Sequence, residues 1–129
     1  MTAALSLAGV RVRYGGVDVL DVASFDVRAG EVLAVIGPNG SGKSTLLRVL
    51  GLLEAPAEGA IHVEGRAVSP ATALAERRRM ATVFQHAHLA RGTVADNVAL
   101  GLRFRRTTDV GARVARWLER LGIAHLRDR

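Results

Sequence analysis

The 129-residue sequence contains no cysteine, which excludes disulfide bonds, thiolate metal sites and cysteine nucleophiles. It also has no apolar stretch near the roughly 18 residues that a membrane-spanning helix needs, and its first residues lack the pattern of a signal peptide. We therefore expect a protein of the cytoplasm. Hydrophobic residues make up 49% of the chain and charged residues 23%, a balance that excludes a disordered protein and allows a core of domain size.

Lysine is nearly absent, and arginine supplies almost all of the positive charge. The 18 basic residues include one lysine, Lys43, which lies in the most glycine-dense segment. A sequence that uses arginine elsewhere and keeps lysine here indicates a position that needs an ammonium group. The net charge is +6, and most of it falls in residues 102–129, which hold eight arginines. Because aromatic residues do not alternate with these arginines, we expect a solvated or protein-covered face and no nucleic-acid partner.

Hydrophobic periodicity predicts a mixed α/β chain. Alternating apolar residues across 1–30, broken at Tyr14, predict two strands joined by a turn. The uninterrupted apolar run within residues 31–37 predicts a strand buried on both faces, as in a parallel sheet. The other expected elements are a helix over 43–50, a hairpin over 59–68, a helix over 73–80, a strand over 81–85, and helices beginning near 93 and 109.

Cap residues mark the last two of these helices. Thr93 followed by Asp96 is a variant of the capping box, and Asp109 is an N-cap candidate. The helix after Asp109 has apolar residues at helical spacing, which predicts a single buried face: Val110, Val114, Trp117, Leu118 and Leu121.

Residues 37–45 read GPNGSGKST and match the phosphate-loop pattern, in which two glycines, a lysine and a serine have fixed places. Glycines allow backbone amides to approach phosphate oxygens closely, and the lysine supplies a charge to the β and γ phosphates. The serine hydroxyl binds Mg²⁺, and the following helix adds unpaired amides. Chance would give this pattern in about one chain in a thousand of this composition. The predicted triphosphate site comprises Gly37, Pro38, Asn39, Gly40, Ser41, Gly42, Lys43, Ser44 and Thr45.

The segment 37–65, GPNGSGKSTLLRVLGLLEAPAEGAIHVEG, resembles the Walker A region, helix and hairpin of ATP-binding cassette (ABC) ATPases. The similarity runs from Leu5 to the end of the chain. It implies an α/β fold of the P-loop NTPase class, with an incomplete RecA-like core, an N-terminal antiparallel β-subdomain and the start of a helical subdomain. The implied division assigns 1–30 and 59–70 to the β-subdomain, 31–58 and 71–85 to the P-loop core, and 86–129 to the Q-loop and the beginning of the helical subdomain.

The resemblance also implies roles for two residues outside the loop, with ATP and Mg²⁺ as cofactors. Tyr14 takes the place of the aromatic residue that stacks on adenine, the alternative being an ordinary half-buried strand tyrosine. Gln85 matches the Q-loop glutamine that helps hold Mg²⁺ and the attacking water, so Gln85 and Lys43 are the implied catalytic residues. His86 and His88 could suggest a metal site, but no third ligand is near in the sequence and we expect loop residues.

Three further motifs of ABC ATPases are missing from the sequence. After Gln85 we find no Walker B strand ending in an acidic pair, no LSGGQ-like signature and no switch histidine. The sequence thus corresponds to about the first half of a cassette. A truncated gene and a fragment of a longer protein would both give this sequence. We expect the chain alone to be inactive, to fold poorly and to expose an apolar edge where neighbouring strands are missing.

The resemblance implies the ATP-binding subunit of an ABC transporter, peripheral on the inner face of the cell membrane. Its partners would be a second ATPase subunit, a membrane permease at the Q-loop and, indirectly, a solute-binding protein. The segment 93–105, TVADNVALGLRFR, is similar to importers of oxyanions such as tungstate, molybdate or phosphate, with amino-acid importers as the alternative. A soluble ABC protein of translation or DNA repair, and a truncated nucleotide-binding module without turnover, remain open. The hairpin directly after the Walker helix favours the transporter.

Overall fold

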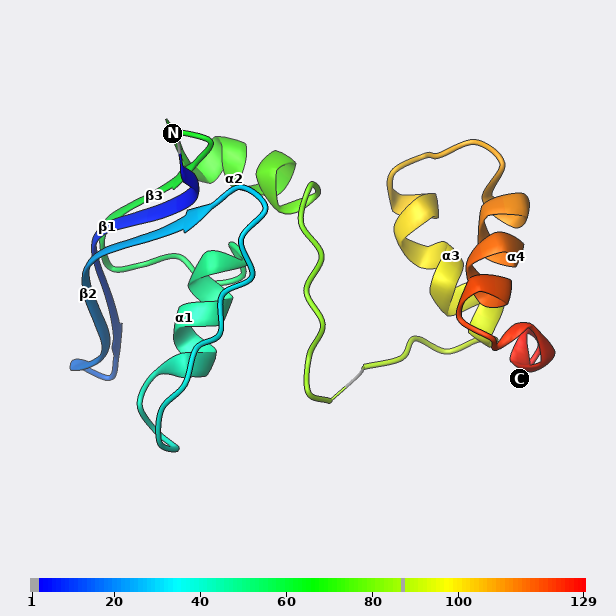
Figure 1. Cartoon of the computed structure of the whole chain (residues 1–129), viewed down its shortest axis with the longest axis horizontal. Coiled ribbons are helices and arrows are strands. Elements are labelled where there is room, and N and C mark those ends of the chain that lie inside the picture. The colour runs from blue at the N-terminus through cyan, green and yellow to red at the C-terminus, as the bar shows by residue number, and fades with distance from the viewer. Residues whose placement is uncertain (1–2, 87) are drawn as a thin grey trace. The chain divides into compact units, whose positions relative to one another are not determined.

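The computed structural model describes residues 3–86 and 88–129. The chain divides into two compact units, Met1–Thr82 and Val83–Arg129, and each has its own hydrophobic core (Figure 1). Within the described ranges, no helix is both long enough and apolar enough to cross a bilayer.

The first unit is built on a four-stranded antiparallel sheet with the order β2-β1-β3-β4. Two long strands pair along their length, a third pairs with the other edge of the first, and a short fourth strand completes a hairpin. These strands are β1 (Ala3–Tyr14), β2 (Val17–Arg28), β3 (Glu58–Val63) and β4 (Arg66–Ala67). The predicted pair of strands and the predicted hairpin are therefore confirmed.

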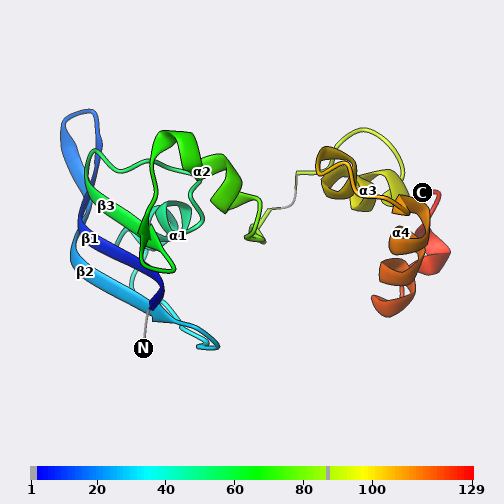
Figure 2. The ribbon, with the colours of Figure 1, turned by 90° about the horizontal axis from the view of Figure 1, so that it is seen from above.

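Helix α1 (Lys43–Leu50) packs against one face of this sheet (Figure 2). Leu7 and Val10 of β1 both enter the core although they are three residues apart, because β1 has an irregular register against β3 between Ala8 and Arg11. The buried core consists of Leu7, Val10, Val12, Leu46, Val49, Leu52, Ile61 and Val63.

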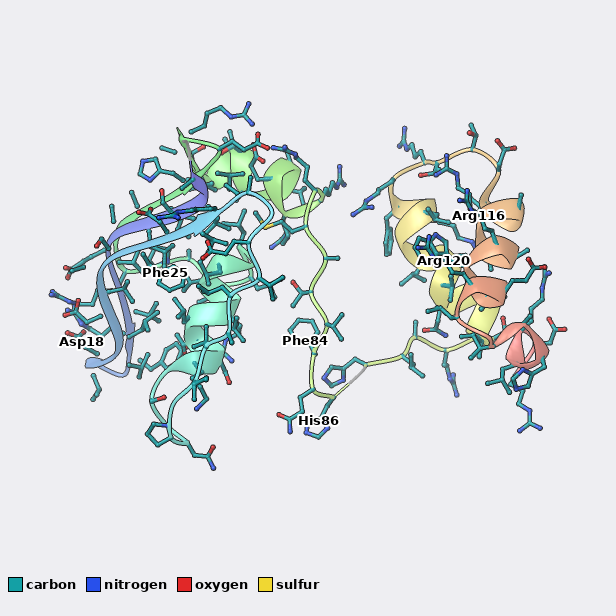
Figure 3. All side chains as sticks on the ribbon, viewed as in Figure 1. Asp18, Phe25, Phe84, His86, Arg116 and Arg120 are labelled. Carbon is teal, nitrogen blue, oxygen red and sulfur yellow. The ribbon has the colours of Figure 1, made fainter. Side chains whose placement is uncertain are left out.

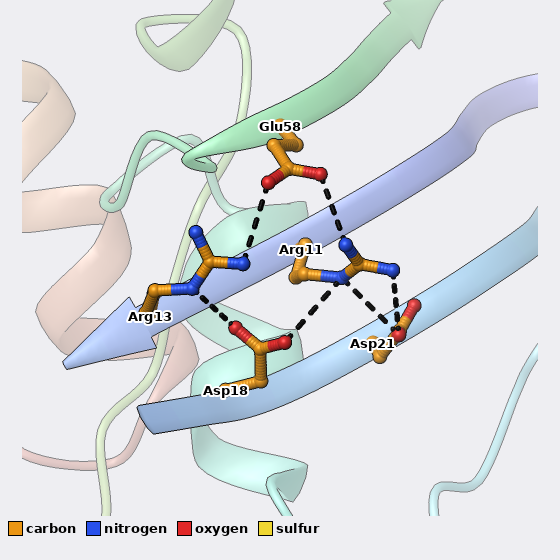
Figure 4. Close-up of polar contacts among 5 residues, drawn as sticks. All are labelled: Arg11, Arg13, Asp18, Asp21 and Glu58. Atoms are coloured by element: carbon orange, nitrogen blue, oxygen red, sulfur yellow. Dashed lines mark hydrogen bonds and ion pairs between the residues drawn. The ribbon is translucent and has the colours of Figure 1, made fainter. Parts of the chain in front are cut away.

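The outward-facing side of the sheet carries a charge network that joins three strands (Figure 4). Arg11 of β1 forms ion pairs with Asp21 of β2 at 3.0 Å and with Glu58 of β3 at 3.1 Å. Arg13 extends the network by pairing with Asp18 and Glu58. All these side chains are partly exposed, so water screens each pair and each adds little stability.

Helix α2 (Pro70–Arg77) begins three residues before the start predicted from the sequence. The Ser69 side chain accepts a hydrogen bond from the Thr72 amide, and the Thr72 hydroxyl accepts one from the Ser69 amide, which completes a capping box. Pro70 fits the first helical position because it needs no amide hydrogen there. These two local features place the start of the helix at residue 70, ahead of the predicted residue 73.

Two predicted strands are absent, and the predictions for 31–37 and 81–85 are wrong for this chain. Both segments run without regular structure, and no strand among the described residues pairs with either. A parallel strand needs a neighbour for its backbone hydrogen bonds, and the sheet that forms is entirely antiparallel. Val32 is 98% exposed, Ile36 92% and Val83 97%, so apolar side chains stand in water as expected for an uncovered edge.

The second unit is a helical hairpin of α3 (Val94–Phe104) and α4 (Val110–Arg120), followed by a 3-10 turn, η1 (Ala124–Leu126). Thr93 and Asp96 form the predicted capping box, and these bonds, with help from Arg103, lower the pKa of Asp96. Asp109 stands at the predicted N-cap, but its backbone is left-handed and its side chain bonds to no described amide of the helix.

The buried face of α4 is narrower than the sequence predicts. Val114 and Leu118 are buried against Ala99 of α3, whereas Trp117 is 48% exposed. Among the described residues, α3 is the one α-helix that packs on α4. It covers the row formed by Val114 and Leu118 and leaves the neighbouring row, which contains Trp117, open to solvent. The Arg120 guanidinium lies 5.2 Å from the centre of the Trp117 ring, and Figure 3 labels it together with Arg116 on the same helix.

Candidate functional site

The glycine-rich loop before α1 has a backbone that other residues would strain. Gly40 has a φ of +81° and Gly42 a φ of +86°, both in the left-handed region. At Gly37 a Cβ would lie 2.8 Å from the Ser41 hydroxyl oxygen, so any side chain would displace Ser41. The Ser41 amide donates to the Pro38 carbonyl at 3.3 Å, which closes the turn. The loop therefore has the bare, curved backbone that close approach of an anion requires.

Lys43 folds back over this loop. Its Nζ donates hydrogen bonds to the Gly37 carbonyl at 2.8 Å and to the Pro38 carbonyl at 2.6 Å. An ammonium group has three donors, so one N–H remains for a ligand after these two bonds are made. The loop thus holds the ammonium group in place with one donor left for a ligand.

Helix α1 starts at Lys43, with Gly42 as N-cap and no capping side chain among the described residues. The first helical bond runs from the Leu46 amide to the Gly42 carbonyl at 2.8 Å, which leaves the preceding amides of the first turn for other acceptors. The positive end of the helix dipole adds to the field at this point.

The two hydroxyl residues of the first turn differ in surroundings. Ser44 is exposed, so its hydroxyl is open to a ligand. Thr45 is 7% exposed, and its Oγ1 accepts a hydrogen bond from Arg48 at 3.1 Å. Its hydroxyl is therefore engaged within the protein, and the predicted contribution of Thr45 reduces to its backbone amide.

Tyr14 lies at the end of β1, and its hydroxyl is held by two charged residues that sequence reasoning missed. The hydroxyl donates to the Glu54 carboxylate and accepts from Arg48 at 3.2 Å. The hydrogen bond from Tyr14 and the neighbouring Arg48 guanidinium lower the pKa of Glu54. The only usable signal in the sequence was the i, i+3 spacing of Thr45 and Arg48 on one helix face.

Gln85 is exposed and lies in the second unit, in the segment from which Phe84 and His86 project (Figure 3). The structure brings the residues of 37–45 together around one loop, with Tyr14 tied to the same helix. Gln85 belongs to the other unit, so its role at the metal stays a prediction.

The residues present fit a nucleoside triphosphate with Mg²⁺. Backbone amides and one ammonium donor suit phosphate oxygens, the exposed Ser44 hydroxyl suits Mg²⁺, and the half-exposed Tyr14 ring offers a π face to a base. The glycine backbone described above is the observation that supports this fit, because a Cβ at Gly37 would fill part of the cradle.

The family model described as ABC transporter matches residues 20–129. The chain belongs to the ABC transporter family. The glycine-rich loop at 37–45, α1 and the whole second unit fall inside the matched range, whereas β1 and Tyr14 precede it.

Several relatives in this family are named as import proteins. The methionine import ATP-binding protein MetN of Caulobacter vibrioides is 45% identical over 85% of this chain and 35% of its own length. The phosphate import ATP-binding protein PstB 2 of Natronomonas pharaonis is 42% identical over 91% of this chain and 39% of its own. The sulfate/thiosulfate import ATP-binding protein CysA of Mycobacterium bovis is 39% identical over 100% and 37%. The chain thus spans little more than a third of the length of these relatives.

A solved ABC structure has the same fold. CbiO1 of Clostridium perfringens, described as part of the ABC transporter complex CbiONQ, matches with a TM-score of 0.81 at 27% identity. The match covers 100% of this chain and 54% of CbiO1. The predicted fold class, a P-loop NTPase domain of the ABC type of which this chain holds a part, is confirmed.

Proposed function

We propose that this chain is the ATP-binding part of an ABC import ATPase and that its loop at 37–45 holds Mg²⁺–ATP. The geometry of Lys43 carries the proposal. Its ammonium group donates to two loop carbonyls and keeps one N–H for a ligand, at the start of α1, where no described side chain caps the helix. Family membership supports the choice of ATP, because the relatives above are all named as ATP-binding proteins.

Each group in the site then has a task. Lys43 and the amides of residues 40–45 bind the phosphates, and Tyr14 stacks on the adenine. Ser44 and Gln85 are the residues that would hold the magnesium ion, which when bound neutralises phosphate charge. Gln85 also orients the attacking water. The hydrolytic activity of the whole protein, which Lys43 and Gln85 would support, is part of the proposal.

The proposed role of the whole protein is to drive the import of a small solute. The import names of the relatives favour transport over a soluble function in translation or DNA repair. The proposed partners are a second ATPase subunit, a membrane permease that meets the segment after Gln85, and a solute-binding protein reached through the permease. Such a subunit would lie on the inner face of the membrane. The relatives named above are called importers of methionine, phosphate and sulfate or thiosulfate, so their names do not choose between an oxyanion and an amino acid. The similarity of segment 93–105 to oxyanion importers supports an oxyanion as the proposed solute, with an amino acid as the alternative.

The proposed metal role predicts a magnesium-dependent effect of Ser44→Ala. We expect the variant to bind ATP about 3- to 10-fold more weakly in the presence of Mg²⁺, because one oxygen ligand is lost. Without Mg²⁺ its affinity should equal that of the unmodified chain. Isothermal titration of the chain fused to a soluble carrier measures both values, with the carrier alone as the blank.

Ser24→Ala is the matched control, since Ser24 is an exposed serine of β2 outside the loop. It should bind ATP like the unmodified chain under both conditions. A loss of equal size with and without Mg²⁺ in Ser44→Ala would show that the hydroxyl has a structural role and does not bind the metal.

A further inference from the structure

A polar network connects the end of β1, helix α1 and the turn that follows it. Arg48 of α1 is at its centre: it donates to the Tyr14 hydroxyl at 3.2 Å, to Glu54 at 3.0 Å and to Thr45 Oγ1 at 3.1 Å. The Tyr14 hydroxyl closes the network by donating to Glu54. We call Tyr14, Arg48 and Glu54 the tyrosine clamp.

The clamp restrains the tyrosine from its hydroxyl end. The hydroxyl uses both its donor and an acceptor lone pair on charged partners, and such charge-assisted bonds are the stronger kind. Tyr14 nevertheless remains 46% exposed, whereas the Glu54 side chain is only 18% exposed. The hydroxyl is thus engaged by protein groups, while nearly half of the Tyr14 surface stays open to solvent.

The clamp also ties the ring to the phosphate loop. Thr45 is the second residue after Lys43 on α1, is buried, and accepts a bond from the same guanidinium that holds Tyr14. A helix of this kind is stiff over one turn, so the distance from the ring to the loop is set by Arg48 rather than by the strand end alone.

We propose that Glu54 and Arg48 are positioning residues that hold the Tyr14 ring at a fixed distance from the phosphate loop and so set the affinity for the adenine part of ATP. The inference rests on the proposed function, since it assumes that the loop binds a triphosphate and that Tyr14 stacks on the base. It adds that the stacking surface is pre-organised by residues outside the nucleotide-binding motif. Pre-organisation raises affinity because the ring is not ordered at the moment of binding.

Two ligands separate positioning from a general structural role. ATP uses the ring and the loop, whereas inorganic tripolyphosphate uses the loop only. We expect Tyr14→Phe, which keeps the ring and removes the hydroxyl, to weaken ATP binding about 3- to 10-fold and to leave tripolyphosphate binding unchanged. Glu54→Gln should do the same, because it removes the charged acceptor of the same bond.

A double variant and a control complete the test. The double variant, Tyr14→Phe with Glu54→Gln, should lose no more ATP affinity than either single variant, since both changes remove the same hydrogen bond. Glu64→Gln is the control: Glu64 also pairs with two arginines, Arg66 and Arg79, outside the clamp, and should not alter either affinity. Titration calorimetry of the carrier-fused chain with each ligand gives the ratio of the two affinities.

The possible outcomes distinguish this inference from the proposed function. ATP affinity that is unchanged in Tyr14→Phe, losses of equal size for ATP and tripolyphosphate, or additive losses in the double variant would each overturn the clamp while leaving phosphate binding by the loop intact. An unmodified chain that binds neither ligand would overturn the proposed function and the clamp together. A selective loss for ATP that does not grow in the double variant supports the clamp.

Discussion

Lys43→Ala is expected to weaken ATP binding by at least about 30-fold, the loss of one charge-assisted contact worth about 2 kcal/mol or more. The ammonium is clamped by the carbonyls of Gly37 and Pro38, so its charge is already in place before a ligand arrives. Alanine removes both the charge and the two bonds that shape the loop. Tripolyphosphate should lose affinity by a similar factor, because the contact is to phosphate and not to the base.

Lys43→Arg is the informative companion variant. Arginine keeps the charge, but its planar fork cannot place a compact donor between two carbonyls as an ammonium does. We expect an affinity between those of the unmodified chain and Lys43→Ala. Titration calorimetry measures the ATP affinity of the unmodified chain and of both variants. If Lys43→Ala bound ATP as tightly as the unmodified chain, Lys43 would not be a phosphate-binding residue.

Gly59→Ala should destabilise the first unit by about 3 kcal/mol or more. Gly59 of β3 has a φ of +88°, and an added Cβ would lie 2.3 Å from the Gly9 carbonyl oxygen and 2.6 Å from that of Ala8. These are backbone atoms of β1, so neither can turn away as a side chain would. The two strands must separate where β1 is irregular, next to Val10 of the core.

Gly16→Ala separates the two causes of this loss. Gly16 has a nearly equal φ of +84°, but its Cβ would meet nothing within 4 Å. Gly16→Ala should therefore lower the free energy of unfolding only by the cost of holding alanine in the left-handed region, about 1 kcal/mol. Native-state hydrogen exchange of the β1 amides, followed by mass spectrometry, compares the two variants. Equal protection in both would show that the contact with β1 is not a constraint on the fold.

Local signals predicted those parts of the fold that local interactions determine. The turn after Tyr14, the phosphate loop, and the Thr93–Asp96 capping box depend on residues close together in the sequence, and all three form. The segment 31–37 is apolar, as a buried strand would be, but a strand forms only with a neighbour that pairs with its backbone. Its backbone has none among the described residues, and so Val32 and Ile36 remain exposed.

The candidate site divides in the same way. The loop residues could be found because glycine, lysine and serine at fixed spacing reflect the chemistry of one continuous segment. Arg48 and Glu54 could not, because they join Tyr14 across 34 and 40 residues, and their pattern is common on any helix surface. Trp117 is half-exposed beside the buried row of α4, because periodicity predicts the direction of the apolar face but not the width that one neighbouring helix covers.

Chemical protection of the single lysine tests the central claim most directly. Lys43 is the only lysine in the chain, so acetylation of its ε-amine can be followed on one peptide by mass spectrometry. If Lys43 holds the phosphates, Mg²⁺–ATP at about ten times its dissociation constant should slow this acetylation roughly tenfold, whereas adenosine should leave the rate unchanged. An acetylation rate that saturating ATP does not alter would contradict the account.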